Sequence, residues 1–478
     1  MTRVSSFTIL SGSVLDGKRV LMNGCFGGID IITSELAEFL EDTIKSSPHG
    51  QAYVEEASFL PVTFADLMER GHLTSRSHEE EKSLAVEIAL GMHEKEKKRP
   101  YVMIAPSMDC NYRCTYCFER HLQNGLNSDT GNISYKKNNV VMRSEMIAQI
   151  YRAIGKIRKG AGLDAGGMII LYGGEPLDST NKELIMDIAR QGVAEGYWFS
   201  AITNGHDLDT FAPIVNKDMV RQIQVTIDGP RDLHDQRRIH HGRGSSFDKI
   251  ITNVRNILCR GGVEVHIRCH VDPENIHLFE ELLSFFAREG WTDNKSVIIY
   301  ANTLYQKSAG EVCAKIIGQD IHTHLDSLAG AHWNVFTSGP SVHISRSLQS
   351  VFSEGERFPL KGTYCSANFG NYIFAPDGNI YACWESIGKE SSRIGALTEE
   401  GYRIETAPVQ KWFSRTVAGV DNCMECAFAL VCGGGCAQYA EYNNGSLNEP
   451  FCDDFQQIFR TTLADEVVRW SNINGCQA

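Results

Sequence analysis

Residues 108–118 read Met-Asp-Cys-Asn-Tyr-Arg-Cys-Thr-Tyr-Cys-Phe and place Cys110, Cys114 and Cys117 at the spacing C-x3-C-x2-C. The run directly follows Tyr101–Ala105, a short apolar segment typical of a buried strand. Three thiolates on one short loop can hold three corners of an iron–sulfur cubane. No fourth ligand stands nearby, so one iron would stay open for an exogenous ligand. A zinc loop is the alternative, although zinc requires a fourth ligand.

Outward from this loop, six short apolar runs predict strands, and amphipathic stretches between most of them predict helices. Six strand–helix units in about 200 residues predict an α/β fold whose parallel sheet curls into a partial (β/α)6 TIM-like barrel. In such a barrel the chemistry sits at the carboxyl ends of the strands. The strands are expected at Tyr101–Ala105, Met168–Tyr172, Trp198–Thr203, Gln222–Asp228, Val263–Val271 and Val297–Ala301.

Polar residues stand at the ends of these strands. Gly173 and Gly174 permit close backbone approach, and Glu175 supplies an acceptor for an ammonium group. The fourth and fifth strands each alternate polar with apolar residues, so the polar residues share one face. That face either lines a barrel lumen or forms a solvated strand edge. Its members are Gln222, Gln224, Thr226 and Asp228 on one strand and Glu264, His266, Arg268 and His270 on the next.

The cysteine loop, with Tyr116 before its last cysteine, resembles the radical S-adenosylmethionine (radical SAM) superfamily. The resemblance extends to Gly173-Gly174-Glu175, similar to the motif that binds the methionine amino group, and to Thr226-Ile227-Asp228-Gly229, followed by His234 and Arg238. It implies a [4Fe–4S] cluster on the three cysteines with S-adenosylmethionine at the open iron. The expected contacts to S-adenosylmethionine are Tyr116, Gly173, Gly174, Glu175, Thr203, Asn204, Thr226 and Arg268. Arg268, taken from the polar strand face, is a candidate for the carboxylate of S-adenosylmethionine or for the substrate.

Seven more cysteines lie between residues 365 and 452, and their spacing resembles the SPASM domain of radical SAM enzymes that modify peptides and proteins. The resemblance implies two auxiliary [4Fe–4S] clusters, which makes three in all. Cys423, Cys426, Cys432 and Cys452 would hold the distal one, and Cys365, Cys383 and Cys436 the nearer one. The eighth ligand is open: Cys313, Cys25 or a substrate cysteine are candidates. Two four-thiolate zinc ribbons are the alternative.

Four segments are expected. Residues 1–98 combine β-prone runs with three amphipathic helices and predict a winged-helix-like peptide-recognition module. Residues 99–305 form the partial barrel, residues 306–360 a bridge, and residues 361–478 the auxiliary-cluster domain with a C-terminal helix.

Composition narrows the function classes. The chain has 478 residues, 46 basic and 59 acidic, with a net charge of −13, a poor match for a phosphate backbone. No nucleic-acid partner is therefore expected. No apolar run approaches the ~20 residues that span a bilayer, and the N-terminus lacks a secretory pattern, so a cytoplasmic protein without a membrane partner is expected. Fifteen cysteines in a reducing compartment favour metal binding over disulfides.

The resemblance implies an enzyme whose 5′-deoxyadenosyl radical modifies a ribosomally made polypeptide with a leader segment. Thioether formation is the preferred reaction, and a reductant such as flavodoxin or ferredoxin is expected. The alternative reactions are C–C or C–O crosslinking, epimerisation and formylglycine formation, which require the same clusters and S-adenosylmethionine. Asp228 and Glu385 are candidate proton acceptors. The rival classes are a small-molecule radical dehydrogenase and a non-catalytic metal-stapled scaffold.

Overall fold

The computed structural model of the chain describes residues 2–14, 17–47, 53–119, 141–242, 244–308, 311–315 and 332–474. The chain folds into two compact units, each built from separated stretches of sequence. The terminal unit contains Met1–Glu96, Ser338–Cys365 and Arg415–Ala478, and the barrel unit contains Lys97–Thr337 and Ser366–Ser414. Residues 306–360 and 361–478, expected as a bridge and a domain, are each divided between the units.

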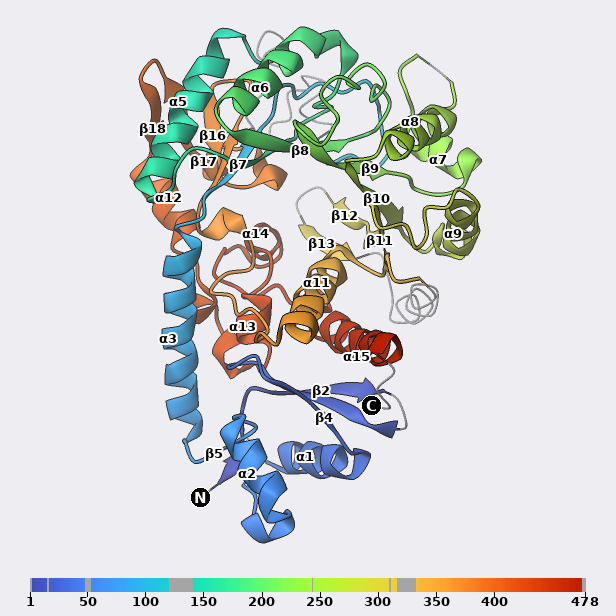
Figure 1. Ribbon diagram of the computed structural model, residues 1–478. Helices are drawn as coiled ribbons and strands as arrows, with labels where there is room; N and C mark the ends of the chain where they lie inside the picture. Colours follow the sequence, from blue (N-terminus) through green and yellow to red (C-terminus); the bar gives the residue numbers. More distant parts are fainter. Residues whose placement is uncertain are drawn as a thin grey trace. The chain divides into compact units, whose positions relative to one another are not determined.

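The barrel unit is built on an eleven-stranded sheet with the order β14-β11-β10-β9-β8-β7-β6-β15-β16-β17-β18 (Figure 1). Strands β6 to β11 are all parallel and confirm the six strands expected from the sequence. Their bounds are Tyr101–Ile104, Gly167–Leu171, Tyr197–Thr203, Val220–Thr226, Glu264–Val271 and Val297–Thr303.

Amphipathic helices follow most of these strands and lie on the outside of the curved sheet (Figure 1). In α8, for example, Ile250, Val254 and Ile257 recur on one face and are fully buried. The unit is therefore an α/β partial barrel, as the sequence predicts. The helices are α5 (Glu145–Gly160), α6 (Lys182–Ala194), α7 (Arg231–Arg237), α8 (Ser246–Arg260) and α9 (Phe279–Arg288).

The sheet continues past both ends of this parallel part. β14 (Val335–Phe336) pairs with β11, and β15 (Asn371–Phe374) pairs in parallel with β6. An antiparallel meander of β16 (Asn379–Tyr381), β17 (Arg393–Thr398) and β18 (Gly401–Ile404) completes the sheet, with α12 (Thr406–Phe413) after it. Cys383 therefore follows a strand of the same sheet that carries the first cysteine loop. A separate hairpin joins β12 (Tyr305–Ser308) to β13 (Glu311–Lys315).

The terminal unit begins with an antiparallel three-stranded sheet in the order β2-β3-β4, and β1 (Arg3–Val4) pairs with β5 (Leu73–Thr74). Thr33 caps the first helix by accepting a hydrogen bond from the backbone N–H of Leu36, as its side chain predicts. The remaining elements are β2 (Thr8–Ser13), β3 (Arg19–Asn23), β4 (Ile29–Ile32), α1 (Ser34–Ser46), α2 (Pro61–Glu69) and α3 (His78–Glu96).

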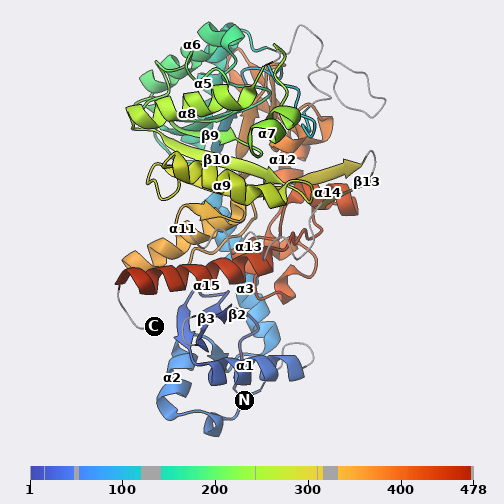
Figure 2. The same ribbon diagram turned by 90° about the vertical axis from the view of Figure 1, so that its right-hand side faces the viewer.

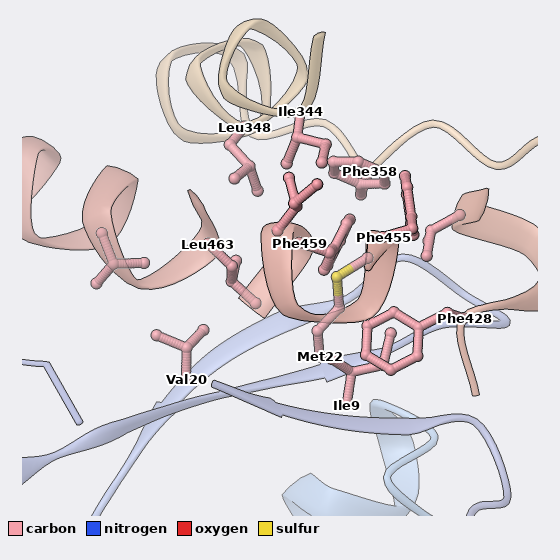
Figure 3. Close-up of a cluster of buried hydrophobic side chains, with 13 residues drawn as sticks. Ile9, Val20, Met22, Ile344, Leu348, Phe358, Phe428, Phe455, Phe459 and Leu463 are labelled. Carbon is pink, nitrogen blue, oxygen red and sulfur yellow. The ribbon is translucent and has the colours of Figure 1, made fainter. Parts of the chain in front are cut away.

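Both faces of the three-stranded sheet are buried because each strand alternates side chains between two apolar cores. Leu10 and Leu21 face α1 and α2, whereas Ile9, Val20 and Met22 face the C-terminal helix α15 (Phe455–Asn474) and α11 (Gly339–Glu354). Figure 3 shows this second core, with Phe459 of α15 among the strand residues and Leu348 of α11. The last helix of the chain thus completes the N-terminal module. Figure 2 shows α1, α2 and α15 in a view turned by 90°.

Within the described residues, no helix has the length and hydropathy required to cross a membrane.

Candidate active site

The cysteine loop follows β6 at the carboxyl edge of the parallel sheet, and backbone hydrogen bonds fix its shape. Arg113 N–H donates to the Ile239 carbonyl at 2.8 Å, and Thr115 N–H donates to the Arg237 carbonyl at 3.0 Å. Tyr112 N–H donates to the sulfur of Cys110 at 3.3 Å. The end of α7 and the residues that follow it therefore hold the loop, a role that no motif in the sequence indicates.

Cys110 and Cys114 are buried, and Cys117 is partly buried. Burial raises the pKa of Cys110 well above its usual range and that of Cys117 to about 12, and negative charge on neighbouring groups raises both further. The Arg238 guanidinium acts against burial at Cys114 and Cys117. Thiols in such a place ionise when a cation binds, because ligation displaces their protons.

Gly173 and Gly174 bring the turn after β7 against the cysteine loop. Gly173 has φ +99°, and a β-carbon at Gly174 would lie 2.1 Å from the carbonyl oxygen of Asp109. The N–H of Glu175 donates to that same oxygen at 2.9 Å. The two glycines permit a close backbone approach, as predicted, and the partner they approach is the loop itself.

Glu175 binds two of the other expected contact residues, Thr203 and Asn204. Its carboxylate is buried and accepts from the Thr203 hydroxyl at 2.6 Å, Asn204 N–H at 2.7 Å and Leu177 N–H at 2.9 Å. Burial raises its pKa to about 7 despite these donors. The Asn204 amide donates to Asn111 in the cysteine loop at 2.6 Å. The ends of β7 and β8 and the loop therefore meet at one place.

A buried polar network joins Tyr116 to the ends of β9 and β10. The Tyr116 hydroxyl donates to Asp228 and accepts from Arg238 at 2.5 Å, and His270 Nδ1 lies 3.0 Å from the Asp228 carboxylate. Burial works against ionisation of Asp228, but His270 and Arg238 hold its pKa below the ordinary value. Burial lowers the pKa of His270 to about 4.

Both Asp228 oxygens are therefore engaged in holding Tyr116 and His270. A proton-accepting role for Asp228 stays a prediction. Neither His270 nor Arg238 was among the expected contact residues, although the strand alternation contains His270 and the motif after Asp228 contains Arg238.

The polar face lies on two central strands, β9 and β10, whose register sets Thr226 opposite Arg268. The intervening Ile223, Val225 and Ile267 are fully buried on the other face. Arg268 Nη2 donates to the Thr226 hydroxyl at 3.4 Å. Among the described residues its buried Nε has no hydrogen-bond partner. An unpaired guanidinium N–H on the polar face of the sheet fits a carboxylate ligand.

Glu385 lies in the turn after Cys383. The ring of its neighbour Trp384 stacks on Tyr172, with centroids 5.8 Å apart, and the charge of Glu385, after burial, raises the pKa of Tyr172. Tyr172 directly precedes Gly173, so this turn approaches the Gly-Gly-Glu segment. A proton-accepting role for Glu385 also stays a prediction.

A second group of thiols converges in the terminal unit. Burial raises the pKa of Cys423 to about 12, and the charges of Cys432, Cys452 and Cys426 raise it further. Cys426 N–H donates to the Cys423 carbonyl at 3.0 Å, Cys426 and Cys432 pack against one apolar core, and Gly435 pairs with Phe451, the neighbour of Cys452. The N–H groups of Gly434 and Gly435 act on the Cys432 sulfur. The four predicted ligands of the distal cluster are thus neighbours.

The remaining predicted ligands are divided, with Cys365 and Cys436 in the terminal unit and Cys383 in the barrel unit. Cys25 packs among apolar side chains next to Met424, and burial raises its pKa to about 12. The Cys313 side chain lies outside the described residues. In the described part of the chain, no group of three His, Cys, Asp or Glu side chains is arranged to hold a single metal ion. An iron–sulfur cubane does not need such a group, because each of its thiolates binds a separate iron.

Comparison with known proteins agrees with this geometry. Residues 104–286 match the family profile described as the radical SAM superfamily. The cysteine-type anaerobic sulfatase-maturating enzyme of Clostridium novyi (strain NT) is 23% identical over 375 residues, covering 76% of this chain and 95% of that protein. The radical SAM cyclopropyl synthase TigE of Paramaledivibacter caminithermalis is 21% identical over 379 residues, covering 76% of this chain and 74% of that protein.

Among solved structures, anSMEcpe with bound AdoMet shares the fold, with a TM-score of 0.56 and 18% identity over 79% of this chain and 99% of that one. The family match spans the cysteine loop, the Gly-Gly-Glu turn and the polar face described above. Residues 104–286 therefore form a radical SAM domain, and the chain is a radical SAM enzyme, a family that implies a [4Fe–4S] cluster and S-adenosylmethionine as cofactors.

Proposed function

We propose that this enzyme is a maturase that modifies a ribosomally made polypeptide and that its reaction forms a thioether between a cysteine sulfur and a carbon of another residue. The observation that carries the proposal is the convergence of Cys423, Cys426, Cys432 and Cys452 in a chain that also has the three-cysteine loop. The relatives named for sulfatase maturation cover three quarters of the chain and support a polypeptide substrate.

Bound together, the cluster and S-adenosylmethionine supply a 5′-deoxyadenosyl radical that removes hydrogen from an unactivated C–H bond. The side chains of the protein bind S-adenosylmethionine and orient it. Glu175 accepts the ammonium group, while the Arg268 guanidinium, with its unpaired Nε, takes a carboxylate. The buried Tyr116–Asp228–His270 network holds the loop and keeps water from this end of the barrel.

We further propose three [4Fe–4S] clusters. Cys110, Cys114 and Cys117 hold the first, and the four converging cysteines of the terminal unit hold the distal auxiliary one. Cys365, Cys383 and Cys436 hold the nearer auxiliary one, whose remaining iron is free to take a substrate thiolate. A reductant of the flavodoxin or ferredoxin kind supplies the electrons.

The leader segment is proposed to add a strand beside β2, an edge strand of the terminal sheet. A groove of about 650 Å³ runs along this edge, between α1 and α15. Charged side chains of both signs line it, including Arg19, Glu41 and Lys45. In such a groove the backbone of the leader can pair with β2, and the charged side chains on either side can select the side chains of the leader.

The decisive experiment is anaerobic reconstitution, followed by incubation with S-adenosylmethionine, a strong reductant and cysteine-containing precursor peptides. We expect 5′-deoxyadenosine, and a peptide that has lost hydrogen while it keeps every sulfur atom. Cys114→Ala removes a loop thiol and is expected to abolish both products, whereas Cys259→Ala, an exposed thiol on α8, leaves them unchanged. Continued 5′-deoxyadenosine formation by Cys114→Ala would contradict the assignment.

Formylglycine formation is the second candidate, favoured by the similarity to cysteine-type sulfatase-maturating enzymes. It replaces the cysteine sulfur with oxygen, so the mass of the product separates the two reactions. A small-molecule dehydrogenase would not require the groove. Lys45→Glu, on an exposed position of α1, should raise KM for a leader-bearing peptide, while Arg190→Glu on α6 should not. Equal KM values would argue against the leader groove.

A further inference from the structure

Arg415 is a buried arginine, 2% exposed, whose guanidinium ties together two loops of the terminal unit. Nη1 donates to the Gly435 carbonyl at 3.1 Å, and Nη2 donates to the carbonyls of Gly434 at 3.0 Å and Glu449 at 3.2 Å. Nε donates to the Leu447 carbonyl. The first loop joins Cys432 to Cys436, and the second leads to Cys452.

The charge of Arg415 has an unusual set of partners. Two other buried arginines, Arg3 and Arg237, each form an ion pair, with Glu81 and with Asp272. Arg415 forms no ion pair with a carboxylate in the described part of the chain, and the negative groups that act on it are Cys365, Cys436, Cys423 and Cys432. A buried cation without a counter-ion is costly. Cys365 and Cys436 are assigned to the nearer cluster, whereas Cys423 and Cys432 are proposed ligands of the distal cluster, whose loops Arg415 contacts directly.

The loop whose carbonyls accept hydrogen bonds from Arg415, residues 433–435, also directs its N–H groups toward the sulfur of Cys432. Gly433, Gly434 and Gly435 have φ values of +83°, +88° and +73°, and a β-carbon at Gly435 would lie 1.8 Å from the Phe451 carbonyl oxygen. The carbonyls of Gly434 and Gly435 face the guanidinium while their N–H groups act on Cys432. The arginine therefore fixes the orientation of the N–H donors around that sulfur.

We propose that Arg415 is a positioning residue and the buried counter-charge of the distal auxiliary cluster. The inference rests on the proposed function, in which Cys423, Cys426, Cys432 and Cys452 hold that cluster. On reduction the cluster takes one electron from a low-potential reductant and gains one negative charge, and no bond is broken. A fixed positive charge stabilises the reduced form more than the oxidised form and raises the reduction potential.

The test uses a full-length background chain in which only the distal ligands remain, with alanine at Cys110, Cys114, Cys117, Cys365, Cys383 and Cys436. After anaerobic reconstitution this background should hold about four irons per chain. A dithionite titration followed by electron paramagnetic resonance then gives the potential of the one cluster. Failure of the background to bind iron would overturn the ligand assignment itself and the Arg415 inference with it.

Arg415→Gln removes the charge and is expected to lower the reduction potential and the fraction of iron retained. Arg415→Lys keeps the charge but cannot reach four carbonyls, so it should lose iron while the remaining cluster titrates near the parent potential. Arg469→Gln is the matched control, because that arginine pairs with Glu466. An unchanged potential in Arg415→Gln, or an equal shift in the glutamine and lysine variants, would overturn the inference while the background iron leaves the ligand assignment intact.

Discussion

Gly174 faces the carbonyl oxygen of Asp109 at a distance that leaves no room for a side chain. This contact joins the Gly-Gly-Glu turn to the cysteine loop, and the hydrogen bond from Glu175 N–H to the same oxygen reinforces it. At the scale of single residues, the site thus depends on backbone contacts as much as on side-chain chemistry. The geometry of the three thiols is set by what packs behind them.

Gly174→Ala should therefore impair assembly of the first cluster. The added β-carbon forces the turn away from Asp109 and is expected to cost about 1–3 kcal/mol of stability. Iron content after reconstitution and 5′-deoxyadenosine yield should both fall. Gly155→Ala on α5 is the matched control, since its β-carbon meets nothing within 4 Å. Equal iron contents in the two variants would contradict the packing role.

Glu175 gives the affinity for S-adenosylmethionine a pH dependence. Its pKa is raised to about 7 by burial, so below that pH the carboxyl group is protonated and no longer attracts an ammonium group. Affinity is expected to fall about tenfold per pH unit as the pH decreases below 7. Equilibrium binding across pH 5.5–8.5 checks this, in wild type and in Glu175→Gln. A flat wild-type profile would show that Glu175 does not bind the charged amine.

At the scale of elements, α15 is the part of the chain that closes the N-terminal module. Phe459 is fully buried, and its ring contacts those of Phe358, Phe428 and Phe455. The helix covers the face of the three-stranded sheet that α1 and α2 leave open. Removing the first 98 residues would therefore expose the apolar side of α15, so point substitutions are the better probe of leader binding.

Phe459→Ala is expected to destabilise the terminal unit by about 3–5 kcal/mol, because a large cavity opens between α15, α11 and the sheet. Urea denaturation of the metal-free chain measures this effect. Leu60→Ala, at a position 75% exposed, should stay within about 0.5 kcal/mol of wild type. Similar losses in both variants would show that α15 does not hold the sheet.

At the scale of the whole molecule, the metal content should report three separate ligand sets. Two of the proposed sets, the loop after β6 and the distal cysteines, each lie within one unit. The sets share no residue, so substitution of one leaves the ligands of the others in place. This separation makes iron counting informative.

The reconstituted chain is expected to bind about twelve irons, as three clusters of four. Alanine at Cys110, Cys114 and Cys117 should remove about four of them, and alanine at the distal ligands about four more. Iron and sulfide analysis checks these values, with Cys259→Ala as the unchanged control. A colourless protein that binds zinc would favour the scaffold alternative.

Much of the barrel could be predicted from the sequence because each strand and each motif is encoded by residues that are close together in the chain. Short apolar runs place the six strands to within a few residues, and the cysteine spacing marks the loop directly after β6. Glu175, Thr203 and Asn204 were expected as one binding group, and they meet. The polar face of β9 and β10 was visible as a period of two, and the sheet order places it on central strands.

Tertiary structure alone decided which distant segments became neighbours. The pairing of β15 with β6, the packing of α15 on the N-terminal sheet and the grip of Arg415 on residues 434–449 each join stretches far apart in sequence. No repeating pattern of residue types encodes such contacts, since they arise from the burial of complementary surfaces. The sequence by itself determined the strands and the ligand types; the folded chain determined what holds those ligands and what balances their charge.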